Sequence, residues 1–377
     1  MFDVLLSLAI SFSITFLAIP VIIRVAESKK LFDVPNERKI HTRLIPALGG
    51  LGIFAGFLLA CLLSIRLYTA PEFQYFIAAA LVMFFLGLKD DILVISPIKK
   101  FLGQVIAATL IIYMGGVQIT SMHGFLGIHE LPEMFSILLT YFTVIVIINS
   151  FNLIDGIDGL AGTLGIIASS MFGFYFLKAG MTPYAVMGFA LSGSLAAFLI
   201  FNYNPAKIFM GDTGSMLIGL VNAVLVVKFI AVAEQPGINI PVVASPAIGF
   251  TILLIPLLDT LRVFGIRIFH QRSPFSPDRN HIHHLMLDKG WSHTTITCTL
   301  AAFSVLLVGA AYFFREFGCT WVILAGIVIF FGGIAALYYT TSHSRMFVTR
   351  QAIKTKEEEI TKIVPINKEI LLEKQNL

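Results

Sequence analysis

Long apolar runs separated by short polar segments dominate the pattern of this 377-residue chain. Many of these runs approach the roughly 20 residues that a helix needs to cross a bilayer. Because hydrocarbon contains no water to bond a bare backbone, such runs must be helices, and the alternation typical of a β-barrel is absent. We therefore predict an all-α fold, a polytopic transmembrane helical bundle of about 11 (10–11) membrane-spanning helices. The runs cover about residues 4–25, 47–65, 73–88, 98–117, 134–148, 160–177, 184–201, 215–232, 240–261, 294–314 and 321–339.

The composition agrees with this pattern, with 57% hydrophobic and 13% charged residues, and excludes a water-soluble globular protein. Of the 26 Lys and Arg residues, 22 lie in segments that would share one side of the membrane. Basic loops stay in the cytoplasm, so we expect the N-terminus outside and the tail inside. The net charge of +4 requires no nucleic acid, and no nucleic-acid motif is present. The basic segments are 24–46, 89–100, 202–213, 262–293 and the tail after 340.

The stretch 149–162, NSFNLIDGIDGLAG, ends one apolar run with polar side chains between glycines. Asn149, Asn152, Asp155 and Asp158 recur every three residues, so on a helix they fall along one slowly drifting face. The glycines allow tight turns and a close approach to the backbone, which suits phosphates or a hard metal ion. The alternative is a polar loop between two membrane helices.

Two more acidic segments lie at the ends of apolar runs. In GLKDDI, Asp90 and Asp91 are adjacent and repel one another unless a cation or a proton lies between them. In FNYNPAKIFMGDTGSMLIG, Asp212 precedes a predicted helix together with Thr213. The alternatives are an ordinary solvated helix end for the first segment and a helix cap for the second.

The long loop after residue 261 carries the histidines His281, His283 and His284. We disfavour zinc because the chain has no HExxH and no cysteine nearby, and the basic residues of the loop suit anionic phosphates better. Just before this loop, Asp259 and Arg262 are spaced to pair across one helical turn. We interpret that pair as structural.

Six aspartates fall at or near the same side of the membrane in this topology. Each would cost on the order of 2.5–3.5 kcal/mol if it faced lipid at depth, so together they must line a hydrated cleft. We expect this cleft to hold Mg²⁺, with Mn²⁺ as the alternative, because magnesium prefers oxygen ligands and is often shared between carboxylates and substrate phosphates. The six are Asp90, Asp91, Asp155, Asp158, Asp212 and Asp259.

Four motifs, GLKDDI, NSFNLIDGIDGLAG, FNYNPAKIFMGDTGS and PDRNHIHH, together resemble those of the polyprenyl-phosphate N-acetylhexosamine-1-phosphate transferases. The resemblance covers about residues 1–340, the expected membrane-embedded sugar-phosphate transferase domain, and leaves 341–377 as a charged cytoplasmic tail. Within that superfamily the chain is more similar to the undecaprenyl-phosphate N-acetylglucosamine-1-phosphate transferases. The phospho-muramoyl-pentapeptide transferases carry three consecutive histidines where this chain has HIHH.

The resemblance implies a magnesium-dependent phosphotransferase. Its reaction would join undecaprenyl phosphate and UDP-N-acetylglucosamine into undecaprenyl-diphosphate-N-acetylglucosamine with release of UMP. This is the first membrane step of cell-envelope polysaccharide synthesis. The resemblance further implies a multi-pass protein of the bacterial inner membrane with its active site on the cytoplasmic face.

The same resemblance implies a role for each matched residue. Asp212 and Asn152 would bind the metal, and Asp90 and Asp91 would engage the lipid phosphate and the metal, one of them as a base. The nucleotide would be held by Asn152, Asp155 and Asp158, with Phe209 stacked on uracil and Asn202 supporting that pocket. The pyrophosphate or the sugar would contact Arg279, His281, His283 and His284.

Two other interpretations are weaker. A cation-coupled secondary transporter would place its carboxylates near helix midpoints and often shows an inverted repeat, whereas these carboxylates gather on one side. A structural scaffold would not require this set of carboxylates. Within the transferase interpretation, another UDP-N-acetylhexosamine, the polysaccharide pathway and homo-oligomerisation are left open.

Overall fold

The computed structural model describes residues 1–31, 45–271 and 280–339. Met1–Phe331 form one compact unit, and a second begins at Gly332. Of the second unit, only the residues up to 339 are described. Arg279 and the predicted tail 341–377 lie outside the described residues, so the boundary predicted at residue 340 stays a prediction.

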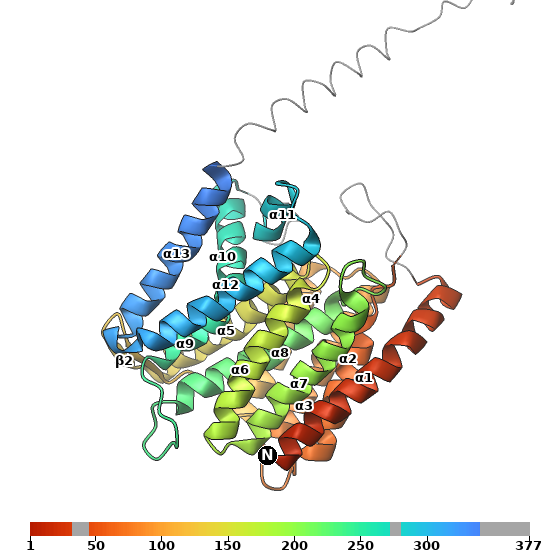
Figure 1. Ribbon diagram of the computed structural model, residues 1–377. Coiled ribbons are helices and arrows are strands. Elements are labelled where there is room, and N and C mark those ends of the chain that lie inside the picture. Colours follow the sequence, from red (N-terminus) through yellow and green to blue (C-terminus); the bar gives the residue numbers. More distant parts are fainter. Residues whose placement is uncertain (32–44, 272–279, 340–377) are drawn as a thin grey trace, which may run out of the picture. The chain divides into compact units, whose positions relative to one another are not determined.

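The described residues confirm the all-α prediction, with a two-stranded hairpin as an exception (Figure 1). The first half of the chain contains α1 (Phe2–Lys29), α2 (Gly49–Ser64), α3 (Phe73–Ile92), α4 (Pro97–Thr109), η1 (Leu110–Met114), β1 (Ser121–Phe125), β2 (Ile128–Glu130), α5 (Glu133–Ile154) and α6 (Leu160–Lys178). The second half contains α7 (Thr182–Asn202), α8 (Gly211–Val232), α9 (Ser245–Ile252), α10 (Leu254–Phe269), α11 (Ile282–Leu287), α12 (His293–Phe313), η2 (Arg315–Phe317) and α13 (Cys319–Tyr339).

Each predicted apolar run folds as a helix or as two successive helices, but the expected number of about 11 spans is not confirmed. Among the described residues, eight helices are long and apolar enough to cross a membrane, and nine if a bent pair counts as one span. The bent pair is α9 and α10, whose axes differ by 77° at a break in the run predicted over 240–261. The helix α2 has only 16 residues, which is shorter than a bilayer requires.

Proline and serine mark several helix starts. Pro97 occupies the first turn of α4, where a missing backbone N–H costs nothing because the first N–H groups of a helix have no partner within it. Ser292 caps α12 by accepting a hydrogen bond of 3.1 Å from the backbone N–H of Thr295. These local signals fix where the helices begin.

The helix α8 is the core of the first unit. Every residue from Thr213 to Val227 is buried, because α8 packs against α2, α3, α5, α6 and α7. Figure 1 shows it enclosed by these neighbours. The polar Asn222, fully buried, donates to the Ile218 carbonyl within the same helix at 2.9 Å.

Glycines set how closely three helices approach α8. A Cβ on Gly219 would lie 2.5 Å from the Ile148 Cα of α5, and one on Gly87 of α3 would lie 2.5 Å from the Thr213 Cα. A Cβ on Gly50 of α2 would lie 2.3 Å from the Gly214 nitrogen. Backbones therefore meet directly, as small residues allow in membrane bundles.

The hairpin β1–β2 pairs Ser121 with Glu130 and Phe125 with Ile128 in an antiparallel register. The Leu126 N–H at its tip donates to Thr320 Oγ1 of α13 at 2.7 Å. This hydrogen bond attaches the hairpin to the start of α13.

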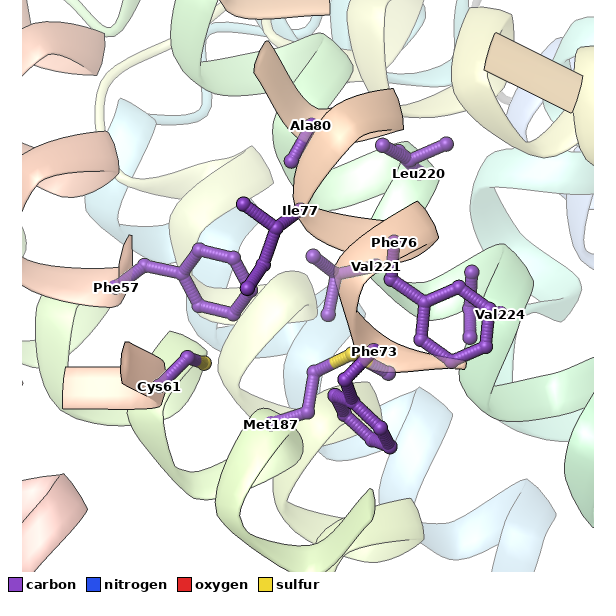
Figure 2. Close-up of a pocket in the computed structure, with 10 residues that line it drawn as sticks. All are labelled: Phe57, Cys61, Phe73, Phe76, Ile77, Ala80, Met187, Leu220, Val221 and Val224. Atoms are coloured by element: carbon purple, nitrogen blue, oxygen red, sulfur yellow. The ribbon is translucent and has the colours of Figure 1, made fainter. Parts of the chain in front are cut away.

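An apolar pocket lies between α2, α3, α7 and α8 (Figure 2). Its lining includes Phe57, Phe73, Phe76 and Val224, and no lining residue carries a charge. This pocket offers no group for chemistry, and the charged residues gather elsewhere.

We expect Gly219→Ala to destabilise the protein because its added methyl group would overlap the α5 backbone, which cannot move aside without shifting the helix. Overpacking of this kind costs about 1–3 kcal/mol. The apparent Tm in detergent, followed by intrinsic fluorescence, should fall.

The matched control is Gly309→Ala on α12, where nothing lies within 4 Å of an added Cβ. Its Tm should stay unchanged or rise slightly, because alanine favours a helix over glycine. Equal Tm values for the two variants would contradict the close contact between α5 and α8.

Candidate active site

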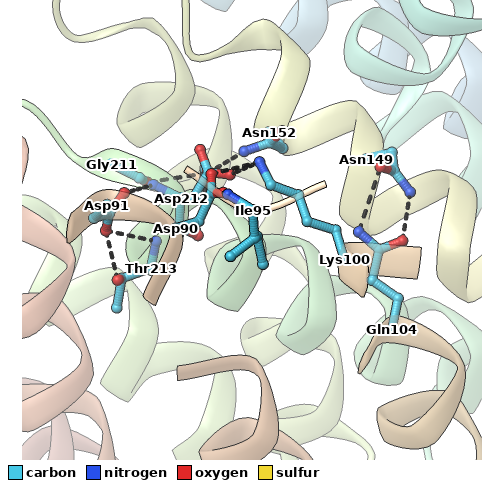
Figure 3. A network of polar contacts seen from close by, with 11 residues as sticks. Asp90, Asp91, Ile95, Lys100, Gln104, Asn149, Asn152, Gly211, Asp212 and Thr213 are labelled. Carbon is cyan, nitrogen blue, oxygen red and sulfur yellow. Dashed lines mark hydrogen bonds and ion pairs between the residues drawn. The ribbon is translucent and has the colours of Figure 1, made fainter. Parts of the chain in front are cut away.

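Asp91, at the end of α3, caps the start of α8. Its Oδ1 accepts a hydrogen bond of 2.6 Å from the Asp212 N–H, and its Oδ2 accepts bonds of 3.1 and 2.6 Å from the Thr213 N–H and hydroxyl (Figure 3). The first N–H groups of a helix lack partners within it and carry partial positive charge, so a carboxylate is stabilised there. Both oxygens of Asp91 are therefore engaged by α8.

Only glycine fits at the first position of α8. Gly211 has a φ of 72°, a left-handed conformation that other residues rarely adopt. A Cβ would lie 2.4 Å from the Ala47 carbonyl oxygen and 2.7 Å from both Asp91 carboxylate oxygens. The glycine lets Asp91 reach the helix end.

Asp90 and Asp212 face a common cation. The Lys100 Nζ lies 2.6 Å from Asp90 Oδ2 and also pairs with Asp212 Oδ2. Asp90 Oδ1 accepts a further hydrogen bond of 2.8 Å from the Ile95 N–H. The ends of α3, α4 and α8 thus meet at one charged cluster, which we call the acidic cluster and define as Asp90, Asp91, Asp212 and Lys100 (Figure 3).

Amide side chains attach α5 to this cluster. The Asn149 amide donates to Gln104 Oε1 of α4 at 2.8 Å, and the Gln104 amide donates back to Asn149 Oδ1 at 3.4 Å. One turn later, Asn152 donates to Ser215 Oγ of α8 at 3.0 Å. Ser215 in turn donates to the Gly211 carbonyl oxygen, so it links Asn152 to the first residue of α8.

The loop between α5 and α6 holds Asp155 close to other carboxylates. Burial, followed by the charges of Asp212, Asp91 and Asp158, raises the pKa of Asp155 to about 8. A carboxyl group with this pKa is mostly protonated at neutral pH, and burial also raises the pKa of the neighbouring Asp91 to about 7. A cation bound nearby would favour its ionised form.

The loop between α7 and α8 is hydrogen-bonded to the loop between α5 and α6. Asp158 Oδ2 accepts hydrogen bonds from the Asn204 amide at 2.9 Å and the Ala206 N–H at 3.3 Å. The buried Asn202 accepts from the Gly159 N–H at 2.9 Å and donates to the Ile208 carbonyl at 2.8 Å. The two loops are therefore held together by three side-chain groups.

Phe209 lies on the second loop, half-buried, and its backbone pairs with the segment before α2. Its N–H donates to the Pro46 carbonyl at 2.8 Å, and its carbonyl accepts from the Gly49 N–H at 2.9 Å. These bonds fix the backbone that carries the ring. Its stacking on uracil stays a prediction.

His281 is fixed by a buried aspartate of α10. Its Nδ1 lies 2.8 Å from Asp259 Oδ2, and Asp259 Oδ1 accepts bonds of 2.9 Å from the Ile282 N–H and from Arg262. The pair predicted between Asp259 and Arg262 is confirmed. Arg262 also donates to the Asn280 carbonyl, so α10 holds the backbone that leads into α11.

His283 lies against the loop between α5 and α6. A Cβ on Gly156 would lie 2.2 Å from His283 Nε2, so that glycine makes room for the imidazole. The His283 ring stacks on His281 with centroids 5.7 Å apart and neighbours His284 at 4.4 Å. Burial, followed by the charge of His284, lowers the pKa of His283 to about 3, so its imidazole is neutral. It can offer an N–H donor but no charge.

The structure brings most of the predicted site residues to one region. Direct contacts join Asp90, Asp91 and Asp212; Asp155 lies within electrostatic range of them, and His283 touches the Asp155–Gly159 loop. Their roles in binding and catalysis stay predictions. Arg279 lies outside the described residues.

Sequence reasoning did not single out several members of this network. Lys100 belongs to none of the four motifs, and its place between two aspartates depends on tertiary packing. The contacts of Gln104 with α5 and of His293 with Asp158, at 3.3 Å, were likewise not foreseen. The spacing of Lys100 and Gln104, one helical turn apart on the same face, was a signal that could have linked them.

The donor chemistry of the acidic cluster fits a hard divalent cation. Carboxylate oxygens of Asp90 and Asp212, from two helices, converge on one cationic group. Within the described ranges no group of three or more His, Cys, Asp and Glu side chains is arranged to hold a metal ion. Magnesium is often bound by one or two carboxylates together with substrate phosphates, so two converging carboxylates suffice.

Residues 73–230 match the model of glycosyl transferase family 4. The chain is 32% identical over 315 residues to an undecaprenyl-phosphate alpha-N-acetylglucosaminyl 1-phosphate transferase of Escherichia coli O157:H7, covering 82% of this chain and 83% of that protein. It is 33% identical over 341 residues to a decaprenyl-phosphate N-acetylglucosaminephosphotransferase of Mycobacterium leprae, covering 84% and 85%. The matched region contains α3, α4, α5 and the start of α8, which carry the acidic cluster and the beginning of its neighbouring loop.

The raised pKa of Asp155 predicts a pH-dependent stability in metal-free protein. Its folded pKa of about 8 exceeds the ordinary value of 3.8, so the folded state binds more protons between these values and stability falls as pH rises. Asp155→Asn removes this contribution. In EDTA, the Tm of the wild type should fall more steeply from about pH 6 to 9 than that of Asp155→Asn.

The control is Asp3→Asn, at an exposed carboxylate in the first turn of α1. It should keep the wild-type slope of Tm against pH. Parallel slopes for the wild type and Asp155→Asn would contradict the raised pKa.

Proposed function

Because the chain belongs to glycosyl transferase family 4, among the polyprenyl-phosphate sugar-phosphate transferases, we propose that it transfers N-acetylglucosamine 1-phosphate from UDP-N-acetylglucosamine to undecaprenyl phosphate. The products are undecaprenyl-diphosphate-N-acetylglucosamine and UMP. The observation that carries the proposal is the convergence of Asp90 and Asp212 on one cationic group at the ends of three helices.

The names of the relatives support the sugar more strongly than the lipid. The Escherichia coli and Mycobacterium leprae proteins are both named for N-acetylglucosamine, yet one is named for undecaprenyl phosphate and the other for decaprenyl phosphate. We therefore propose N-acetylglucosamine as the sugar and treat the length of the polyprenyl chain as the less constrained feature. Another UDP-N-acetylhexosamine is the alternative substrate.

Phosphoryl transfer chiefly requires alignment of the reacting groups and neutralisation of charge on the non-bridging oxygens. Mg²⁺, or Mn²⁺ in its place, would be held by Asp212 and Asp90 with Asn152 nearby, and would supply Lewis-acid stabilisation of the phosphate oxygens. Asp90 and Asp91 would engage the lipid phosphate, one of them as a base; both oxygens of Asp91 are bonded to the start of α8, and those of Asp90 contact the Ile95 N–H and Lys100. Asp91 keeps the start of α8 in place.

The two bonded loops suit the nucleotide half of the substrate. Asp155 and Asn152 face the acidic cluster, while Asp158 and Asn202 hold the loop that carries Phe209. A planar uracil would stack on the Phe209 ring. The pyrophosphate or the sugar would contact the imidazoles of His281, His283 and His284, with Arg279 supplying positive charge.

The distribution of basic residues supports a cytoplasmic site in the bacterial inner membrane. The segments that carry the acidic cluster belong to the side rich in Lys and Arg. A UDP-sugar is an aqueous anion, whereas a polyprenyl chain remains in hydrocarbon. A site at the cytoplasmic ends of membrane helices can meet both.

The test uses purified full-length protein in detergent with undecaprenyl phosphate, Mg²⁺ and a panel of UDP-sugars. We expect UMP release and a lipid-linked product with UDP-N-acetylglucosamine, and loss of both when lipid or Mg²⁺ is omitted. Asp212→Asn should lower kcat by at least about 100-fold, as loss of a charged group that stabilises a transition state does.

The exposed Asp3→Asn variant removes the same charge far from the cluster in sequence and should retain wild-type turnover. Release of UMP with a different UDP-N-acetylhexosamine would correct the sugar and keep the reaction. No release with any UDP-sugar by protein that retains its Tm would refute the transferase and make cation-coupled transport the next hypothesis.

A further inference from the structure

Lys100 supplies the acidic cluster with a cation from the chain itself. Its ammonium group pairs with Asp90 Oδ2 at 2.6 Å and with Asp212 Oδ2, although the three residues belong to α4, α3 and α8 (Figure 3). The side chains of Asp90 and Asp212 are 12% and 24% exposed, so water alone screens them poorly. The contact with Lys100 offsets the repulsion between them.

A divalent cation would require the same carboxylate oxygens. Mg²⁺ binds carboxylates through direct contacts near 2.0–2.1 Å. An ammonium group that contacts Asp90 Oδ2 and Asp212 Oδ2 occupies the space where such an ion would lie. Two cations cannot share this space because they repel one another.

The backbone of α4 at Lys100 is held in place, whereas the Lys100 side chain can rotate about its own bonds. Gln104, one turn further along α4, is bonded through both of its amide atoms to Asn149 of α5. The lysine stem has four flexible carbons, and the side chain is 26% exposed. The ammonium group can therefore leave the carboxylates by rotation about its own bonds, without movement of α4.

We propose that Lys100 is an exchangeable counter-ion of Asp90 and Asp212, which a divalent cation displaces. The displaced ammonium group then binds an anionic group of the substrate. This inference rests on the proposed function, because it concerns how the same site accepts its metal ion. In the metal-free protein, the Lys100 ammonium group offsets the charge of the two carboxylates. It also occupies the oxygens that a cation from the solvent would otherwise contact.

The first test measures Mn²⁺ binding to the full-length protein in detergent, without substrates, by electron paramagnetic resonance. Lys100→Gln removes the competing charge and should bind Mn²⁺ about tenfold more tightly than the wild type, the order of change produced by one close charge. Lys100→Arg keeps the charge and should bind Mn²⁺ no more tightly than the wild type. Lys99→Gln, at an exposed neighbour, removes the same net charge and should leave the affinity unchanged.

A second measurement needs no variant. Reductive methylation of the wild-type protein, read by mass spectrometry, reports how accessible each lysine is. Addition of Mn²⁺ should raise the rate of modification at Lys100, because its ammonium group has left the carboxylates, and should leave Lys99 unchanged as an internal reference. This measurement decides the matter if Lys100→Gln does not fold.

The outcomes separate the inference from the proposed function. If the wild type binds Mn²⁺ and Lys100→Gln binds it equally or more weakly, or if methylation of Lys100 does not respond to Mn²⁺, the exchange is refuted while the transferase stands. If neither protein binds Mn²⁺, the metal site itself is refuted and the exchange with it. Sugar transfer without any metal dependence in the UMP assay would likewise refute the metal site and the exchange.

Discussion

The capping of α8 by Asp91 is the interaction on which the rest of the site depends. The first turn of α8 is partly buried and its free N–H groups need an acceptor, which Asp91 supplies from the end of α3. This contact brings Asp90 and Asp212 close together, because Asp90 directly precedes Asp91 and one of the bonded N–H groups belongs to Asp212 itself. The acidic cluster is therefore a consequence of how two helices are joined.

Several elements then converge on this joint. The loop between α5 and α6 contributes Asp155, the loop after α7 is attached through Asn202 and Asp158, and α11 contributes His283 in contact with Gly156. Each of these contacts links segments that lie far apart in the chain. Carboxylate, amide and imidazole side chains from these separate segments thus adjoin one another at the ends of the helices.

The sequence predicted the helical class and the closeness of Asp90, Asp91, Asp155 and Asp212, because apolar runs and basic loops are local signals. It was wrong in placing Asp259 in a hydrated cleft, since that residue is fully buried and bonded to Arg262 and His281. It did not predict the partners of Asp90 and Asp212, since Lys100 reaches them only after α3, α4 and α8 have packed. The predicted number of about 11 spans is not confirmed for a related reason: an apolar run reveals neither the bend between α9 and α10 nor where the short helix α2 ends. The structural pairing of Asp259 with Arg262 was predictable because it lies within one helical turn.

The burial of His283 determines how this histidine responds to a fall in pH. With a pKa of about 3, its imidazole stays uncharged even at around pH 5, where an ordinary histidine would be mostly protonated. Acid stress would therefore not add a positive charge at this position or drive it away from its neighbouring histidines. The contact of His283 with the loop between α5 and α6 is therefore insensitive to acidification in this range.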